Sequence, residues 1–291
     1  MSTVPTDWFR IQAERGLQPF LILEGASQDN AQQALHELEE APDYAPLFAF
    51  IPALREALPV SPMLVRVTSS SPIVSWFLSE DRFSRLGLFL ASNHDTESAA
   101  KLFAGRLFLK NEVDSHVLCR WHDPQVLCDC MMLSEGSIFP FVVQGFSSVL
   151  MHGHVADCMD AWTVCDIPER NVRWNETLPF AFMEALHEVR ETRLLDWHIA
   201  TLRGGVRQTV DTISTNKHGC DVRIFPRQSH AAVSQEEREA AQAELRALEA
   251  KYGITDQQDL FEARRLKTER RTTDMDALLH CQATPAHTRN I

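Results

Sequence analysis

Glycine is scarce in this sequence, with only 11 among 291 residues. The two glycine-rich loops that most often hold nucleotides, G-x-x-x-x-G-K-[ST] and G-x-G-x-x-G, need closely spaced glycines so that the backbone can approach a phosphate. Neither occurs in the chain, which excludes nucleotide sites of these two types. The G-x-S-x-G turn of serine hydrolases is also missing. Its nearest approach, Gly145-Phe-Ser-Ser148, lacks the second glycine, so we do not expect serine hydrolysis.

Long apolar runs are absent as well. No window approaches the ~20 apolar residues of a membrane-spanning helix, and Met1–Asp7 has neither the basic nor the apolar region of a signal peptide. The seven cysteines are odd in number and follow no framework spacing, which is typical of reduced thiols inside a cell. We therefore expect a cytoplasmic protein that does not insert into membranes.

Positive charge is in deficit, with 28 Lys and Arg against 40 Asp and Glu and a formal net charge of −12. Such a field repels phosphate backbones and anionic lipid surfaces, so we expect no nucleic-acid binding. The apolar fraction of 44% is that of a globular protein with a substantial core.

The N-terminal half alternates short apolar runs with amphipathic segments. We predict strands near 20–24, 63–67, 86–91, 106–110 and 116–121, with weaker strands over 139–143, 147–152 and 161–166. Helices are predicted between them, and Asn111–Asp114 is typical of a four-residue hairpin loop. This alternation predicts an α/β fold with a mixed, largely parallel sheet and flanking helices.

The pattern becomes mainly helical after Ile167-Pro168. One helix is predicted from Thr177–Pro179 to Gly204-Gly205, and two capping boxes, Ser234–Glu237 and Thr255–Gln258, each begin another. Residues 206–233 give no clear pattern, and the last ~15 residues lack periodicity and are expected to be loose. We therefore predict two domains, an α/β lobe over 1–167 and a helical lobe over 168–291.

Several groups of metal-ligating residue types occur, but their spacing is unusual. Cys128-Asp-Cys130 has one intervening residue, whereas common structural zinc sites have at least two, and buried cysteines also serve as small apolar residues. His152-Gly-His154 with Cys158 is the best remaining set, because H-x-H on a strand serves some catalytic zinc sites. A metal-dependent hydrolase that uses these three residues is our alternative hypothesis. His187–Glu191 lacks the second histidine of the H-E-x-x-H helix and is explained by an amphipathic surface helix.

One stretch, Val117-Leu-Cys-Arg-Trp-His-Asp-Pro-Gln-Val-Leu127, is more distinctive. Asp123 is a favourable N-cap and Pro124 a favourable first helical residue, so a helix should begin directly after the strand that ends at Trp121. Arg120 is close enough in sequence to pair with Asp123 or with a neighbouring carboxylate. The residues by themselves therefore predict a structural role for this turn.

The same stretch resembles the F-R-F-Y-D-P-R-V-L signature of the type VI secretion effector chaperones, or adaptors, a family formerly described only as a domain of unknown function. The resemblance covers residues 20–145, where Glu24 stands in place of the expected Asp and His122 in place of Tyr. It is carried in the same order by Leu21–Ala26, Asp43–Phe48, Met63–Val67, Ser71–Leu78, Gly87–Ser92 and Phe139–Phe141.

The resemblance implies a non-enzymatic protein that binds a cognate secreted effector through the effector's N-terminal region, keeps it soluble and helps load it onto the secretion spike or its tip. It implies no cofactor and no metal. Arg120, Trp121, Asp123 and Pro124, as signature residues, are our candidate partner contacts. Six Trp and 16 Phe offer aromatic surface for such contacts.

Overall fold

The computed structural model describes residues 3–26, 30–79, 86–133, 138–155, 158–169, 177–203, 212–229 and 232–268. The chain divides into two compact units. Unit 1 comprises Met1–Arg190 and Arg207–Ser229, and unit 2 comprises Glu191–Val206 and His230–Ile291. The division therefore falls after residue 190, inside a long helix, and not at the predicted residue 167.

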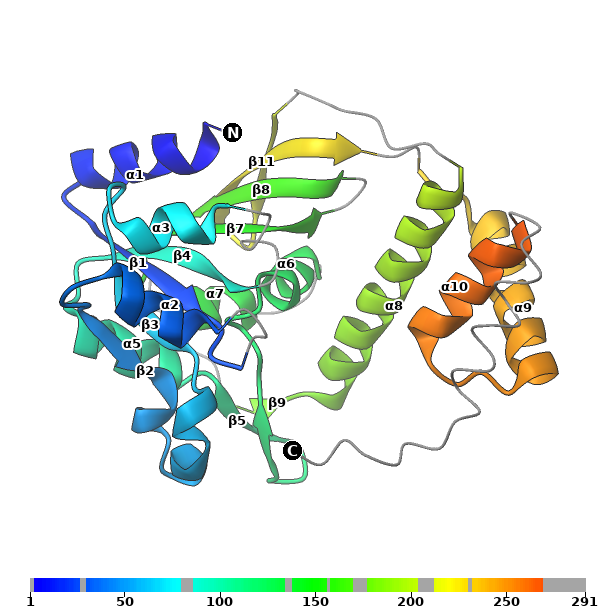
Figure 1. Cartoon of the computed structure of the whole chain (residues 1–291), viewed down its shortest axis with the longest axis horizontal. Helices are drawn as coiled ribbons and strands as arrows, with labels where there is room; N and C mark the ends of the chain where they lie inside the picture. The colour runs from blue at the N-terminus through cyan, green and yellow to red at the C-terminus, as the bar shows by residue number, and fades with distance from the viewer. Residues whose placement is uncertain are drawn as a thin grey trace. The chain divides into compact units, whose positions relative to one another are not determined.

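Unit 1 is built on an eight-stranded sheet in the order β10-β11-β8-β7-β4-β1-β3-β2 (Figure 1). Each described pair of neighbours in it is antiparallel, so the α/β class is confirmed but the prediction of a largely parallel sheet is wrong. The strands are β1 (Gln18–Leu23), β2 (Tyr44–Pro46), β3 (Met63–Arg66), β4 (Gly87–Ser92), β7 (Ser148–Val155), β8 (Cys158–Asp166), β10 (Ile213–Lys217) and β11 (Cys220–Ser229).

The central strands are buried on both faces, which explains the error. Along β1, Phe20 and Ile22 enter one apolar core while Leu21 and Leu23 enter the other. Such strands are apolar throughout, a pattern more often found in parallel sheets. Here β1 lies between β3 and β4 and runs antiparallel to both. The helices that follow β1 and β3 in the sequence therefore do not connect parallel neighbouring strands.

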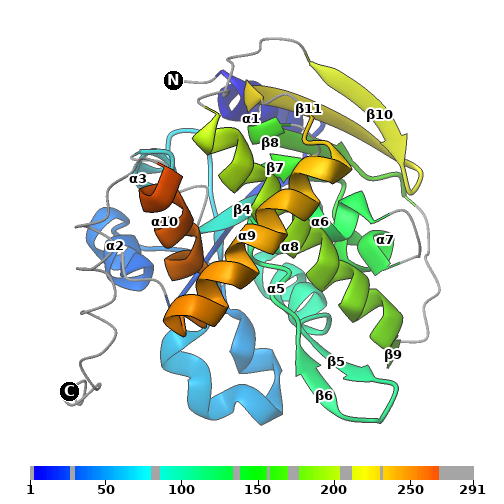
Figure 2. The ribbon, with the colours of Figure 1, turned by 90° about the vertical axis from the view of Figure 1, so that its right-hand side faces the viewer.

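Helices cover both faces of this sheet. Figure 2 shows α2 and α3 on one side and α5, α6 and α7 on the other. The core that holds Leu21 and Leu23 takes residues from α1, α2 and α3, and the core that holds Phe20 and Ile22 takes residues from α5, α6 and α7. The helical segments before β7 are α1 (Val4–Glu14), α2 (Ala31–Leu38), the 3₁₀ segments η1 (Leu47–Phe50) and η2 (Pro52–Val60), α3 (Pro72–Phe77), α5 (Thr96–Ala104), α6 (Pro124–Met132) and α7 (Ile138–Val143).

Two of the three weaker strand predictions are confirmed, as β7 and β8, but residues 139–143 form helix α7. Pro140 lies in the first turn of α7, where a backbone N–H has no helical partner and proline is tolerated. A central strand would lose a ladder hydrogen bond at the same position.

The predicted hairpin forms β5 (Phe108–Asn111) and β6 (His116–Leu118), but it belongs to a separate small sheet. There β5 also pairs in parallel with β9 (Thr177–Leu178). The side chain of Asn111 accepts hydrogen bonds from the backbone N–H groups of Val113 and Ser115, at 3.2 and 2.9 Å. This closes the four-residue loop.

The described secondary structure of unit 2 is helical. It comes from α8 (Phe180–Leu202), which begins in unit 1, and from α9 (Gln235–Tyr252) and α10 (Gln257–Thr268). The capping box of Ser234 and Glu237 is confirmed. The second predicted box is displaced by one residue, because Asp256 and not Thr255 accepts the N–H of Asp259, at 3.1 Å. Gly204-Gly205 and the final residues lie outside the described residues.

Residues 213–229, which gave no clear pattern, form the hairpin of β10 and β11 and extend the sheet of unit 1 beyond β8. His218 and Gly219 form its two-residue loop and both have positive φ, 52° and 71°. That pair of angles is the mark of a type I′ turn, which joins antiparallel strands with their natural twist.

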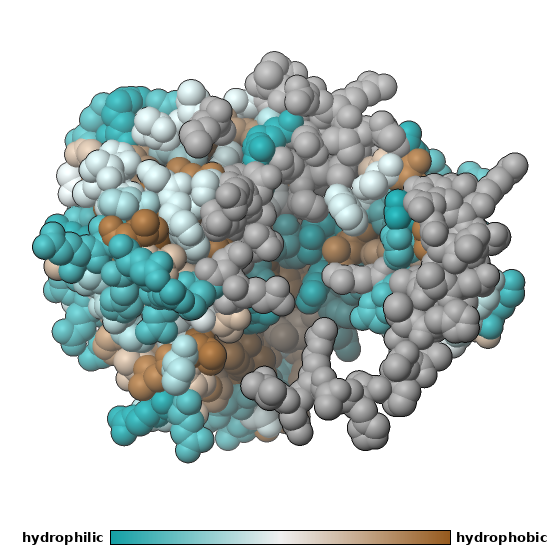
Figure 3. All heavy atoms as spheres, viewed as in Figure 1, coloured by the Kyte–Doolittle hydropathy of each residue, from teal (hydrophilic) through white to brown (hydrophobic). Residues whose placement is uncertain are grey.

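Polar side chains cover most of the described surface in the view of Figure 3, with smaller apolar patches between them. Trp8, Trp121 and Trp162 are buried, so much of the aromatic content lies in the core and not on a partner surface. Among the described residues, the exposed large apolar side chains are those of Leu38, Val60, Val113, Leu118, Phe180, Trp197 and Ile213. No helix within the described ranges combines the length and apolarity needed to cross a bilayer.

Candidate partner-binding site

The signature turn begins α6 as predicted. Asp123 is the N-cap, and its Oδ1 accepts hydrogen bonds from the backbone N–H groups of Gln125 at 2.9 Å and Val126 at 3.4 Å. Pro124 follows as the first helical residue, where its missing N–H costs nothing. The prediction of a cap is confirmed.

Arg120 links this turn to the end of β1. Its guanidinium lies 3.3 Å from Oε2 of Glu24 and 3.7 Å from Oδ2 of Asp123. Its side chain is 59% exposed, whereas that of Glu24 is only 14% exposed. The pair therefore places a cation at the surface above a largely buried carboxylate.

Glu24 is held by several backbone contacts. Its N–H donates to the carbonyl of Leu86 at 2.6 Å, and its Oε1 accepts from the N–H of Ala26 at 3.2 Å. A Cβ on the next residue, Gly25, would lie 2.0 Å from the carbonyl oxygen of Ser61. Glycine is required there because the two backbones are in direct contact, and the position of Glu24 is fixed in consequence.

The pKa of Glu24 is lowered to about 2 by these surroundings. Burial is the largest single influence and acts in the opposite direction, because it penalises the charged form. The hydrogen bond and charge of His122, the N–H of Ala26 and the charge of Arg120 together outweigh it. Glu24 is therefore a carboxylate, and its role is to pair with cations and donors.

His122 is the closest partner of Glu24, with its Nε2 2.9 Å from Oε2 of the carboxylate. Both positions depart from the family that the sequence resembles, as do Cys119, Trp121 and Gln125 within the signature. The departures at Glu24 and His122 are in contact, although 98 residues separate them. Glu is one methylene longer than Asp, and the imidazole of His is shorter than the phenol of Tyr. We therefore expect the two changes to compensate one another in length.

Two of the four candidate contact residues lie in the interior. Trp121 is 1% exposed, and its indole N–H donates to the carbonyl of Arg106 at 3.0 Å. Pro124 is buried at the start of α6. Arg120 and the half-buried Asp123 are the members of the set that present surface, and their contact with a partner remains a prediction.

Arg106 is a structural residue that the sequence did not reveal. It is 6% exposed, its guanidinium donates to the carbonyl of Val142 at 2.8 Å, and it lies over the ring of Phe141. Burial lowers its pKa to about 10. Trp121 and Arg106 together therefore tie the segment before α6 to α7, which explains a buried tryptophan in the signature.

The alternative metal set, His152, His154 and Cys158, lies on β7 and β8. His152 packs against Trp162 in the core beneath α1, with ring centroids 4.9 Å apart. Gly153 faces the other side, where a Cβ would lie 3.1 Å from Sγ of Cys128 on α6. The absence of a side chain at Gly153 therefore lets α6 pack closely against the sheet. Cys128 and His152 lie on opposite faces of that sheet.

Among the residues whose side chains are described, no three His, Cys, Asp or Glu groups come together as metal ligands. The side chains of His154 and Cys158 are outside that set. Cys128 and Cys130 are buried thiols, and burial raises the pKa of Cys130. This is the behaviour of apolar core residues.

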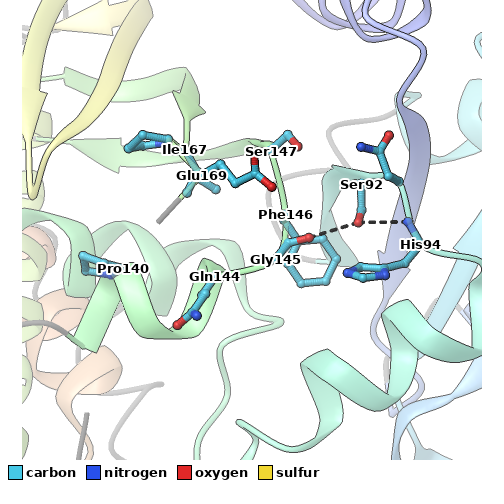
Figure 4. Close-up of a pocket in the computed structure, with 11 residues that line it drawn as sticks. Ser92, His94, Pro140, Gln144, Gly145, Phe146, Ser147, Ile167 and Glu169 are labelled. Atoms are coloured by element: carbon cyan, nitrogen blue, oxygen red, sulfur yellow. Dashed lines mark hydrogen bonds between the residues drawn. The ribbon is translucent and has the colours of Figure 1, made fainter. Parts of the chain in front are cut away.

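A pocket of about 580 Å³ lies elsewhere in unit 1, where β4 and β8 end and β7 begins (Figure 4). Its volume is within the usual range of ligand sites. The Gly145-Phe-Ser segment noted in the sequence forms part of its wall. Its walls come from the segments Ser92–His94, Gln144–Ser147 and Ile167–Glu169, together with Pro140.

The described residues of the pocket do not pair a serine hydroxyl with a histidine that could act as its general base. The hydroxyl of Ser92 is bonded to the carbonyl of Gly145 and the N–H of His94, and within the described residues the imidazole of His94 bonds neither Ser92 nor Ser147. Serine catalysis needs that pair. The geometry supports binding of a polar group.

Comparison with known protein families gives a match over the segment that contains β1 to α6. Residues 19–135 match the model of a domain of unknown function, DUF4123. The matched region is about two fifths of the chain and includes Glu24 and the whole signature turn. No curated protein and no solved structure is significantly similar to the chain.

Proposed function

We propose that this protein is a chaperone or adaptor that binds one secreted effector, keeps it soluble in the cytoplasm and helps to load it onto a type VI secretion spike. The observation that carries the proposal is the DUF4123 match over residues 19–135. The signature motifs from Leu21 to Leu127 fall inside that region and occur in the order expected of effector chaperones.

The site geometry supports binding over catalysis. Glu24, the carboxylate of the signature region whose pKa is strongly lowered, is paired with His122 and Arg120 and does not line the pocket of Figure 4. The metal-dependent alternative gains no support from the described side chains, since no three potential metal ligands come together among them. We therefore propose that the protein is not an enzyme.

The proposal is tested by deleting the gene and measuring the effector encoded nearest to it. We expect the amount and secretion of that one effector to fall, while an unrelated effector of the same secretion system is unaffected. Co-expression of the two proteins should give a complex that survives size-exclusion chromatography. Equal solubility, abundance and secretion of the effector without this protein would refute the proposal.

A further inference from the structure

We propose that the pocket between the ends of β4, β7 and β8 binds a lysine or arginine side chain of the escorted polypeptide. The identity of that polypeptide rests on the proposed function, whereas the chemistry of the pocket does not. The pocket is preformed, its described lining carries a carboxylate and no lysine or arginine, and its size suits a peptide segment.

The walls of the pocket are joined to one another by hydrogen bonds. The hydroxyl of Ser92, a residue only 1% exposed, donates to the carbonyl of Gly145 at 3.0 Å and accepts the N–H of His94 at 3.2 Å (Figure 4). The backbone of Ser147 donates to Ala91 at 2.8 Å and accepts from Ile167 at 3.0 Å. All three wall segments are therefore fixed relative to one another before any ligand arrives, which lowers the entropic cost of binding.

Gly145 keeps this arrangement open. It has a φ of +86°, a backbone conformation that disfavours other residues, and a Cβ there would lie 2.5 Å from Cδ2 of Leu102. The glycine lets the segment after α7 turn sharply along the pocket wall. The glycine noted in the sequence thus has a structural role.

The described lining of the pocket carries one carboxylate, that of Glu169. Within the described residues, Glu169 has no ion-pair partner, and no lysine or arginine is among the residues that line the pocket. The nearby Asp166 is already paired with Arg15 at 2.8 Å and with Arg223 at 2.6 Å. Asp95, next to His94, caps α5 through the N–H of Ser98 at 2.7 Å. A cation is therefore the ion that this pocket favours.

The dimensions favour a side chain on a polypeptide over a small free cation. A cavity of about 580 Å³ is larger than a single arginine side chain requires. The side-chain amide of Asn93 carries N–H donors and a carbonyl acceptor, which can pair with the C=O and N–H of a peptide bond. We therefore assign the occupant as a basic side chain together with its flanking backbone.

The test uses nuclear magnetic resonance of the full-length, isotope-labelled protein and needs no effector. The probe is the capped peptide acetyl-Gly-Arg-Gly-amide, with acetyl-Gly-Glu-Gly-amide as the charge control and agmatine as the free cation. We expect the arginine peptide to shift the amide signals of Ser92–His94 and Gln144–Ser147 in a saturable way. The acidic peptide should not shift them, and agmatine should bind more weakly than the arginine peptide.

Two variants complete the test. Glu169→Gln should weaken binding of the arginine peptide by about fivefold, the effect of losing a partly exposed ion pair. Glu56→Gln, the same charge change at an exposed residue outside the pocket, should leave it unaltered. Unchanged melting temperatures would show that both variants are folded.

Absence of pocket shifts, equal binding of the acidic peptide, or unchanged affinity in Glu169→Gln would each overturn the proposal. Agmatine that binds as tightly as the peptide would overturn the assignment to a polypeptide. These outcomes are independent of the gene deletion, so a normal peptide titration with an unaffected effector would refute only the proposed function.

Discussion

Two carboxylates hold the signature turn, one from within it and one from a distant strand. Asp123 caps α6 through its own backbone neighbours, and Glu24 reaches the turn from the end of β1. The first contact is local in sequence and the second is not. A single substitution therefore tests the cap of Asp123, and a double-mutant cycle tests the contact between Glu24 and His122.

We expect Asp123→Ala to destabilise the protein by about 0.5–2 kcal/mol, because two backbone N–H groups at the start of α6 lose their acceptor. Thermal or urea unfolding measures the change. Asp123→Asn should retain most of the stability, since its side-chain oxygen also caps helices.

Effector binding by Asp123→Ala should weaken no more than the lost stability explains. An unchanged melting temperature together with abolished binding would show that Asp123 contacts the partner and does not serve as a cap.

A double-mutant cycle tests whether Glu24 and His122 compensate for one another. Glu24→Asp and His122→Tyr should each destabilise the protein by about 1–3 kcal/mol, because each leaves a buried polar group without its partner. The double variant should recover much of that loss, since it restores a pair of similar total length. Urea unfolding gives the coupling free energy, expected at about 0.5–3 kcal/mol. Additive losses would contradict the compensation.

The sequence identified Asp123 because a cap and the N–H groups it binds lie within three residues. It could not identify the bond between Glu24 and His122, because nothing in either local pattern specifies a partner 98 residues away. Both positions depart from the resembled family, but so do Cys119, Trp121 and Gln125, so departure alone does not single out this pair.

At the scale of elements, strand positions were predicted better than strand partners. The predicted strands near 20–24, 63–67 and 86–91 coincide with β1, β3 and β4 to within two residues. Their apolar character records burial on both faces, and this burial is the same whether a neighbour runs parallel or antiparallel. The apolar pattern that revealed the strands therefore could not determine whether neighbouring strands run parallel or antiparallel.

The hairpin of β10 and β11 depends on the turn at His218-Gly219. We expect Gly219→Val to destabilise this hairpin by roughly 1–3 kcal/mol, because a β-branched residue is strained at a φ of 71°. Hydrogen exchange of peptides covering 213–229 measures the loss of protection.

Gly219→Asn is the matched control and should cost less, since asparagine tolerates positive φ. Equal protection in the valine variant and the native protein would mean that the loop does not need the type I′ conformation.

At the scale of the whole molecule, the two units carry different acid-sensitive groups. In unit 2, His198 is 5% exposed and stacked on Phe261 with ring centroids 4.5 Å apart. Burial and the charge of Arg264 lower its pKa to about 4, against the smaller opposing effects of Glu244 and Glu262. In unit 1, the pKa of Glu24 is lowered to about 2.

These two shifts predict separate pH windows of instability. The unfolded chain binds more protons than the folded one at His198 between about pH 6.5 and 4, and at Glu24 between about pH 4.5 and 2. Stability from each group is therefore complete above its window and is lost as the pH falls through it. We expect peptides of unit 2 to lose hydrogen-exchange protection first, after correction for the intrinsic effect of pH on exchange.

His198→Leu removes the titrating group and should abolish the loss in unit 2 between pH 6.5 and 4, while leaving the response of unit 1 below pH 4.5 unchanged. Identical pH profiles for the native protein and this variant would show that His198 does not control the acid response of unit 2.

The sequence by itself determined the α/β class, the ends of several helices and the absence of two nucleotide-binding motifs, because each depends on residues within a few positions of one another. Tertiary structure decided the rest. The antiparallel order of the sheet, the return of β10 and β11 to unit 1, the pair of Glu24 and His122 and the pocket beside Ser147 all join segments far apart in the chain. Such contacts are selected by the packing of the complete core, and no local pattern records which distant segment will supply the partner.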